Sequence, residues 1–166
     1  FLTGAILLTG VTMAPAQLTV LHSFDGARND GASPNGSLAL SGSFLYGATP
    51  YGGITNYGTL FKINTDGTGY TNLYHCRETA AGGSEPWGSP LVEGTALYGT
   101  TSLGGPPVVI GFTTNAATLA VTTNYSINGT VFKVDAASGV FTSLHNFTGL
   151  DFFGSSDDGS QPWGDL

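Results

Sequence analysis

The sequence predicts an all-β fold made of β-propeller-like blades, each with four antiparallel strands, in an incomplete set of about two full blades and partial flanking blades. Three observations predict it. The 166 residues include 26 glycines and only 9% are charged, no long apolar pattern of helical period is present, and the sequence repeats itself at a period of about 50 residues. Such a period, with four short strand patterns in each unit, is typical of propeller blades.

The internal repeat has an offset of 52 residues in its first half. Residues 45–49 (Leu-Tyr-Gly-Ala-Thr) match 97–101 (Leu-Tyr-Gly-Thr-Thr), and a glycine pair follows each. Beyond the glycine pairs the offset is 71, because 58–63 (Gly-Thr-Leu-Phe-Lys-Ile) match 129–134 (Gly-Thr-Val-Phe-Lys-Val). The second unit therefore contains 19 extra residues, placed within 106–126.

The repeat predicts the organisation of the chain and the places of its strands. The expected segments are a signal-peptide remnant at 1–16, the last strand of a preceding blade with its link at 17–33, blade one with its link at 34–85, blade two with its insertion and link at 86–161, and the first strand of a further blade at 162–166. The expected strands lie near 37–40, 44–49, 58–63 and 70–76, and near 90–93, 96–101, 129–134 and 140–147. The insertion is expected to form an extra hairpin that covers a sheet edge or contacts a partner.

The N-terminal residues have the pattern of an export signal. Residues 1–13 are apolar and uncharged, and Ala-Pro-Ala-Gln at 14–17 places small residues where a cleavage site needs them. The apolar stretch is too short for a membrane span, which takes about 20 residues. We therefore expect an exported protein that is extracellular or on the cell surface; a buried strand is the alternative for this stretch.

Charge and cysteine content exclude some classes of partner. Four Lys and Arg against eleven Asp and Glu give a net charge of −7, which repels nucleic-acid phosphates and anionic membrane surfaces. No nucleic acid and no membrane span are expected. Cys76 occupies a position where the repeat has phenylalanine, so we interpret it as a small buried hydrophobic residue and not as a reactive thiol.

Most acidic residues fall in the links between blades, which are 25–33 (the first link), 77–85 (the second link) and 148–161 (the third link). In an up-and-down blade these links and the loop between the second and third strands emerge at one edge, so the links and the insertion should share a face. Loop carboxylates suit Ca²⁺, but Asp-Gly turns explain them equally well and no calcium-loop spacing is present. We expect no cofactor, with calcium as the alternative. The acids are Asp25, Asp30, Glu78, Glu85, Asp151, Asp157 and Asp158.

Two tryptophans occupy the same repeat position beside these links. Trp87 and Trp163 each stand in Pro-Trp-Gly, and an exposed aromatic ring beside a carboxylate can stack on a sugar. The alternative is a tryptophan that fills space between neighbouring sheets. The candidate ligand-binding residues are Asp30, Trp87, Asp158 and Trp163, and the expected partner is a glycan or a cell-surface component.

Most catalytic patterns are absent from the sequence, and the adjacent Asp157 and Asp158, which leave a carboxylate pair for glycoside hydrolysis open, are also ordinary in a solvated turn. His22 and His145 recur at one repeat position, which favours packing over catalysis, and no metal-site, nucleophile-elbow or phosphate-loop spacing is found. We therefore assign no catalytic residue and no metal ligand, and expect a non-catalytic scaffold that binds a ligand or a surface. The alternative is a fragment of a secreted propeller hydrolase or lyase that acts on polysaccharide.

The repeat pattern as a whole identifies a family resemblance. Pro-x-Gly-x-Leu, Leu-Tyr-Gly-Thr-Thr, Gly-Gly, Gly-Thr-Val-Phe-Lys-Val and Leu-His-Asn-Phe, spread over 18–166, resemble the GloVer-type tandem repeat of exported bacterial proteins. The resemblance implies a propeller-like repeat protein with no established biochemical activity. The insertion, Cys76 and the presence of only two complete units depart from that pattern. Since two units cannot close a ring, we expect either a fragment of a longer product or open sheets that self-associate through their edges.

Overall fold

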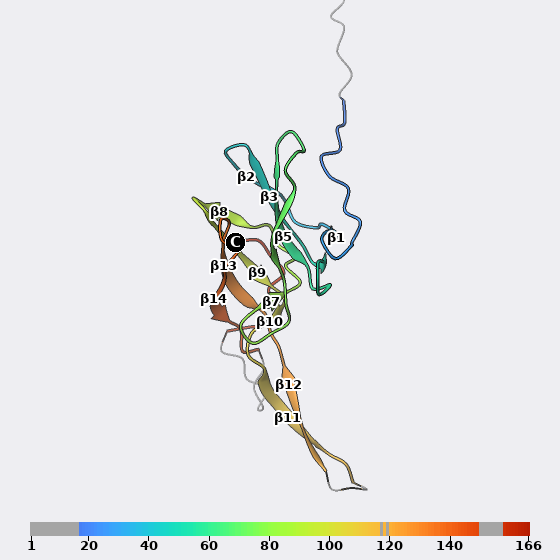
Figure 1. Ribbon diagram of the computed structural model, residues 1–166. Coiled ribbons are helices and arrows are strands. Elements are labelled where there is room, and N and C mark those ends of the chain that lie inside the picture. Colours follow the sequence, from blue (N-terminus) through green and yellow to red (C-terminus); the bar gives the residue numbers. More distant parts are fainter. Residues whose placement is uncertain (1–16, 117, 119, 150–157) are drawn as a thin grey trace, which may run out of the picture.

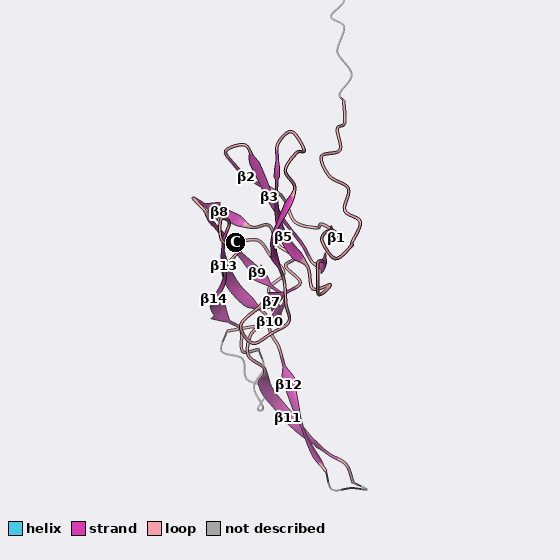
Figure 2. Ribbon diagram, in the orientation of Figure 1, coloured by secondary structure: helices cyan, strands magenta, loops and turns pink. Residues whose placement is uncertain are grey.

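The computed structural model describes residues 17–116, 118, 120–149 and 158–166, and these residues form strands and loops without a helix (Figures 1 and 2). Two four-stranded antiparallel sheets dominate, and neither closes into a barrel. The all-β prediction with incomplete propeller-like blades is confirmed. Blade 1 has the order β2 (Ala39–Ser41), β3 (Phe44–Thr49), β5 (Thr59–Asn64) and β6 (Thr71–His75), and blade 2 has the order β8 (Leu91–Glu93), β9 (Ala96–Thr101), β13 (Thr130–Asp135) and β14 (Phe141–Asn146).

Three two-stranded sheets complete the described fold. β1 (Gly31–Ala32) pairs with β4 (Tyr51–Gly52), and β7 (Gly83–Ser84) pairs with β10 (Leu103–Gly104). The insertion forms the expected hairpin from β11 (Val108–Thr114) and β12 (Val121–Ser126). Figure 1 shows this hairpin extending away from both blades, so it does not cover a blade edge.

The two blades repeat each other in register as well as in sequence. Phe61 lies opposite Gly47 on β3, and Phe132 lies opposite Gly99 on β9. A β-bulge interrupts the outer strand pair after Leu60 in blade 1 and at the equivalent place in blade 2. Because a bulge re-aims the side chains that follow it, its recurrence keeps the outer strands of both blades in the same orientation.

Buried threonine pairs join the end of the second strand to the start of the third strand in each blade. The hydroxyls of Thr49 and Thr59 lie 2.9 Å apart, and those of Thr101 and Thr130 lie 2.8 Å apart. The glycine before each third strand has a positive φ, +98° at Gly58. A Cβ there would strike the carbonyl oxygen of Thr49. The Gly-Thr motif of the repeat is therefore explained by backbone geometry.

The core lies between the blades. We call the face that carries Phe61 in blade 1 and Phe132 in blade 2 the front, and the opposite face the back. The back of blade 1 packs on the front of blade 2, where stacked rings of Tyr74 and Phe141 lie 4.8 Å apart. Burial of this apolar surface is the main source of stability for stacked repeats. The buried members are Tyr46, Ala48, Leu60, Leu97, Phe132 and Val134.

Both flanking segments differ from the strands expected there. A strand is expected between residue 17 and the first link, but none is formed there, and residues 18–24 make no backbone hydrogen bond to another described residue. Residues 162–166 also form no strand, because they are equivalent to 34–38, which precede β2. The proposed domain boundaries remain predictions, and residues 1–16, expected to be the signal remnant, lie outside the described residues.

Candidate functional site

The links between blades and the loops after the second strands lie at one edge of the molecule, which we call the rim. Gly31 of the first link pairs with Gly52, and Gly83 of the second link pairs with Gly104. This is the shared edge that the up-and-down connection predicts. The rim therefore brings together residues that are far apart in the sequence.

Successive Pro-x-Gly segments stack closely along the two blades. A Cβ at Gly36 would lie 2.9 Å from the backbone of Gly88, and one at Gly88 would strike the carbonyl oxygen of Gly164. The amide of Ser37 donates to the Ser89 hydroxyl over 2.7 Å. Glycine at this position allows the segments to approach, and the stacking places the residue between Pro and Gly of each unit in a row.

Two tryptophans of this row and Tyr51 of β4 form an aromatic surface at the rim. The rings of Trp87 and Trp163 are nearly parallel, at 7°, with centroids 5.5 Å apart, and Tyr51 meets Trp87 edge-on at 5.6 Å. Trp163 is 62% exposed. We call Tyr51, Trp87 and Trp163 the tryptophan ledge. Stacking fixes the angle of the Trp163 ring while leaving much of it accessible to a ligand.

A carboxylate lies beside the ledge. Glu85 has a φ of +55°, and its backbone is held by hydrogen bonds to Tyr57 and Ser102. Its Oε2 accepts from Trp87 Nε1 and from the Ser102 hydroxyl, both at 3.4 Å. On the same rim, the carboxylate of Glu78 raises the pKa of Tyr57. The ledge and Glu85 together present an apolar surface with an adjacent hydrogen-bond acceptor.

The structure brings Trp87 and Trp163 together, whereas Asp30 is engaged elsewhere. Asp30 is buried, and its Oδ1 lies 3.1 Å from His22 Nε2. Its Oδ2 accepts from the Asp25 amide over 2.9 Å, and its Oδ1 from the Gly31 amide over 2.8 Å. Burial alone would raise the pKa of Asp30, but these hydrogen bonds hold it below its ordinary value. Asp30 therefore braces the first link.

Asp158 makes the equivalent contacts in the link that follows blade 2. Its Oδ2 lies 2.8 Å from His145 Nε2, and the Thr148 hydroxyl donates to Oδ1 over 2.7 Å. The bonds from Thr148, followed by that from His145, lower the pKa of Asp158. Among the described residues, neither Asp30 nor Asp158 is hydrogen-bonded to the ledge.

Blade 1 and the link that follows it have other residues in place of this histidine–aspartate pair. Tyr74 stands at the histidine position and Gly82 at the aspartate position. The Tyr74 hydroxyl lies 3.5 Å from where a Gly82 Cβ would be, and burial raises the pKa of Tyr74 to about 12. Both members of the pair change together, which indicates a packing role for the recurring histidine.

Sequence reasoning missed Tyr51 as a member of the site and did not single out Glu85 from the other link acids. Tyr51 is equivalent to Leu103, so the repeat favours a packing role for it. The available signal for Glu85 was its position, two residues before the tryptophan of Pro-Trp-Gly. Its orientation toward the ring depends on the positive φ, which the sequence does not reveal.

Metal and thiol chemistry find little support in the part of the chain that the structure describes. No group of three or more His, Cys, Asp or Glu side chains within it could hold a metal ion, and Asp151 and Asp157 lie outside it. Calcium binding remains a prediction. Cys76 is buried, and burial raises the pKa of its thiol, as expected for a small hydrophobic residue.

Comparisons with known proteins place the repeat in a family. A family model described as the Gloeobacter/Verrucomicrobia repeat matches residues 7–166, which confirms the GloVer-type resemblance. No curated protein and no solved structure matches the chain significantly. Among the described residues, no helix is long and apolar enough to cross a membrane. The chain belongs to the Gloeobacter/Verrucomicrobia repeat family.

Proposed function

We propose that this repeat module is a non-catalytic, exported binding protein whose tryptophan ledge binds a sugar ring of an uncharged glycan. The observation that carries the proposal is the exposed ring of Trp163, held parallel to Trp87 beside the Glu85 carboxylate. Export is supported by the apolar stretch and small-residue site at 1–17.

The chemistry of the ledge suits a pyranose ring. The C–H face of a sugar packs on an indole ring, and the hydroxyls at its edge donate hydrogen bonds to a carboxylate. Because Trp163 is already oriented by its stack on Trp87, little conformational freedom is lost when a ligand binds.

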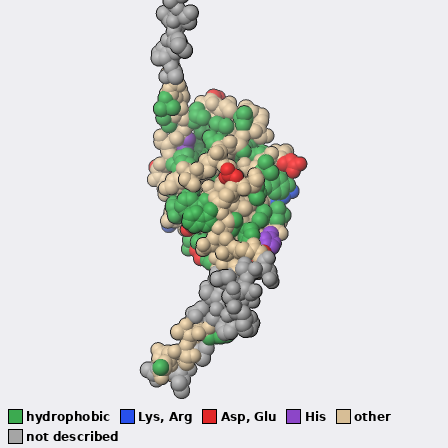
Figure 3. All heavy atoms as spheres, turned by 180° about the vertical axis from the view of Figure 1, so that it is seen from behind, with side chains coloured by type: hydrophobic (Ala, Val, Ile, Leu, Met, Phe, Trp, Pro, Cys, Tyr) green, Lys and Arg blue, Asp and Glu red, His purple; other side chains and the backbone are tan. Residues whose placement is uncertain are grey.

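Charge favours a neutral polymer over an acidic one. The net charge is −7, and Glu85 and Glu78 both lie on the rim. Figure 3 shows charged side chains only as scattered points on the face that it presents. An acidic polysaccharide would be repelled by this surface, whereas uncharged hydroxyls are not.

Calorimetric titration of the full chain with a panel of neutral oligosaccharides tests the proposal. We expect binding by at least one of them, a loss of tenfold or more in affinity for Trp163→Ala, and near-normal affinity for Trp163→Phe, which keeps an aromatic ring. Leu91→Ala, an exposed apolar change on the back of blade 2, is the matched control.

Two results would overturn the proposal. One is the absence of heat with every sugar of the panel, and the other is equal affinity for Trp163→Ala and the unmodified chain. Release of reducing ends by the chain alone would instead identify a polysaccharide hydrolase or lyase.

A further inference from the structure

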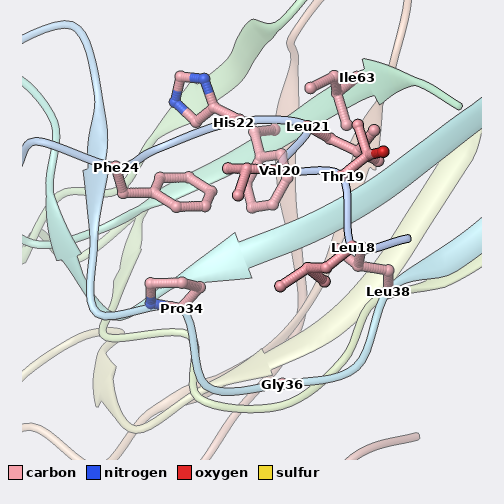
Figure 4. Close-up of a pocket in the computed structure, with 11 residues that line it drawn as sticks. Leu18, Thr19, Val20, Leu21, His22, Phe24, Pro34, Gly36, Leu38 and Ile63 are labelled. Atoms are coloured by element: carbon pink, nitrogen blue, oxygen red, sulfur yellow. The ribbon is translucent and has the colours of Figure 1, made fainter. Parts of the chain in front are cut away.

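An apolar groove of about 370 Å³ lies on the front of blade 1. Residues 18–24 run along one side of it, and the segment before β2 forms the other (Figure 4). Figure 4 shows Leu18, Val20 and Phe24 lining the same space as Pro34 and Leu38. The tryptophan ledge does not line the groove, so binding in the groove is independent of the proposed glycan site.

The equivalent place on blade 2 is filled. Phe132 and Val134 on the front of blade 2 are 1% and 0% exposed, and they share one core cluster with Tyr46 and Leu60 from the back of blade 1. Phe61 and Ile63 on blade 1 are also buried, at 3% and 2%, so the open part of the groove is the part that Leu18, Val20 and Leu38 line. The internal repeat therefore shows, within this one chain, what kind of surface packs on a front face.

Residues 18–24 reproduce the outermost strand of such a covering blade. His22 stacks on Tyr70 at 3.8 Å, as Tyr74 of β6 stacks on Phe141. Phe24 packs against Phe61 at 5.1 Å, and its repeat equivalent, Cys76, directly follows β6. Among the described residues, the front of blade 1 thus carries the counterpart of a fourth strand without the counterparts of the first three.

The exposed apolar side chains of residues 18–24 lie on the side where the first three strands of a covering blade would be. Leu18 is 91% exposed and Val20 69%, although both line the groove. No backbone hydrogen bond joins residues 18–24 to another described residue. An extended segment with an unpaired backbone beside an apolar surface is a template for strand addition.

We propose that the groove is the docking site for the first three strands of a further repeat unit with this chain's own strand pattern, and that the third of these strands pairs with residues 18–24. The third strand carries the Gly-Thr-Leu-Phe-Lys-Ile pattern of 58–63. Its leucine, the counterpart of Leu60, would face the front of blade 1, as Leu60 belongs to the buried cluster that contains Phe132 on the front of blade 2. The second strand brings a tyrosine equivalent to Tyr46.

The test adds the three missing strands to the chain, in the register that the repeat predicts. Since Leu18 is equivalent to Tyr70, a second copy of residues 34–69 is inserted between Gln17 and Leu18 of the full chain. We expect amide hydrogen exchange of residues 18–24 to slow at least a hundredfold relative to the unmodified chain. The matched control is the same insert with its counterparts of Tyr46 and Leu60 changed to aspartate, which should give no such slowing.

Each outcome decides the proposal. The amides of β13 report in every variant whether the two blades are folded. With β13 protected, equal exchange of residues 18–24 with and without the insert would overturn the proposal, and so would equal slowing by the aspartate control. Protection of these residues that grows with concentration in the unmodified chain would assign the groove to a second copy of the chain, and would also overturn it.

Discussion

The front faces of the two blades have nearly the same sequence and the same register, yet they are covered differently. Phe132 lies beneath a complete sheet, whereas Phe61 lies beneath residues 18–24 and borders an open groove. Hydrogen bonding inside each blade is equivalent. Phe61 and Phe132 are both buried, at 3% and 1% exposed, so the comparison shows that each unit determines its own strand pairing, while the kind of surface that covers its front face depends on the neighbouring segment.

The largest expected difference between the two faces is the cost of removing the central phenylalanine. Phe132→Ala should lower the free energy of unfolding by about 4 kcal/mol, since a full sheet surrounds the cavity that it leaves. Phe61→Ala should cost about 2 kcal/mol, because residues 18–24 can move into the space. Urea denaturation of both variants measures the two costs, with the exposed change Leu91→Ala as control. Equal costs would contradict the comparison.

Changes inside the blades should, by contrast, cost the same on both sides. Gly58→Ala and Gly129→Ala each force a side chain into a positive φ, against the carbonyl oxygen of Thr49 or Thr101. Each should lower stability by about 2 kcal/mol. Gly42→Ala, at a positive φ with open space around it, separates the backbone strain from the clash. A much larger effect in one blade than in the other would show that strand pairing also depends on the neighbour.

The sequence predicted the architecture well because the repeat carries local information. Tight turns, Gly-Thr steps and alternating strands depend on residues close in the chain, so most strand bounds agree within one or two residues. The strand expected between residue 17 and the first link, and the strand expected at 162–166, are not formed in the structure, because pairing needs a partner strand, which the pattern of a single segment does not reveal.

The candidate site was predicted only in part, for a related reason. Trp87 and Trp163 stand out as an aromatic pair at one repeat position, and the structure stacks them. Tyr51 and the orientation of Glu85 depend on contacts between the rim loops and on a positive φ. Asp30 differs again, since its burial results from how the first link folds back on His22.

The rate of thiol labelling compares how often the coverings of the two front faces open. Cys76 is buried in front of blade 2, and its repeat equivalent on blade 1 is Phe24. In Phe24→Cys, we expect the new thiol to react at least tenfold faster than Cys76, because residues 18–24 open without separating the blades. Mass spectrometry of labelled peptides assigns the two sites. Equal rates would mean that the segment opens only when the whole protein unfolds.

The smallest expected effect concerns the link carboxylates. The pKa of Asp30 is lowered in the folded protein, so its contribution is present above the ordinary value near 3.8 and is lost as the pH falls through the lower folded value. Asp30→Asn should lower the free energy of unfolding by about 1 kcal/mol at neutral pH. It should also reduce the further loss of stability that the unmodified chain shows as the pH falls below 4. Asp158→Asn removes a more exposed pair and should change both quantities less.

Denaturation at pH 7 and at a series of pH values below 4 measures these effects, with Glu93→Gln, an exposed acid of β8, as the control. The difference arises from solvent: Asp30 is shielded by the first link, whereas water competes for the bonds of Asp158 and screens its partner. If Asp158→Asn costs as much as Asp30→Asn, the two links brace their blades equally, and the contrast between the faces is confined to the apolar core.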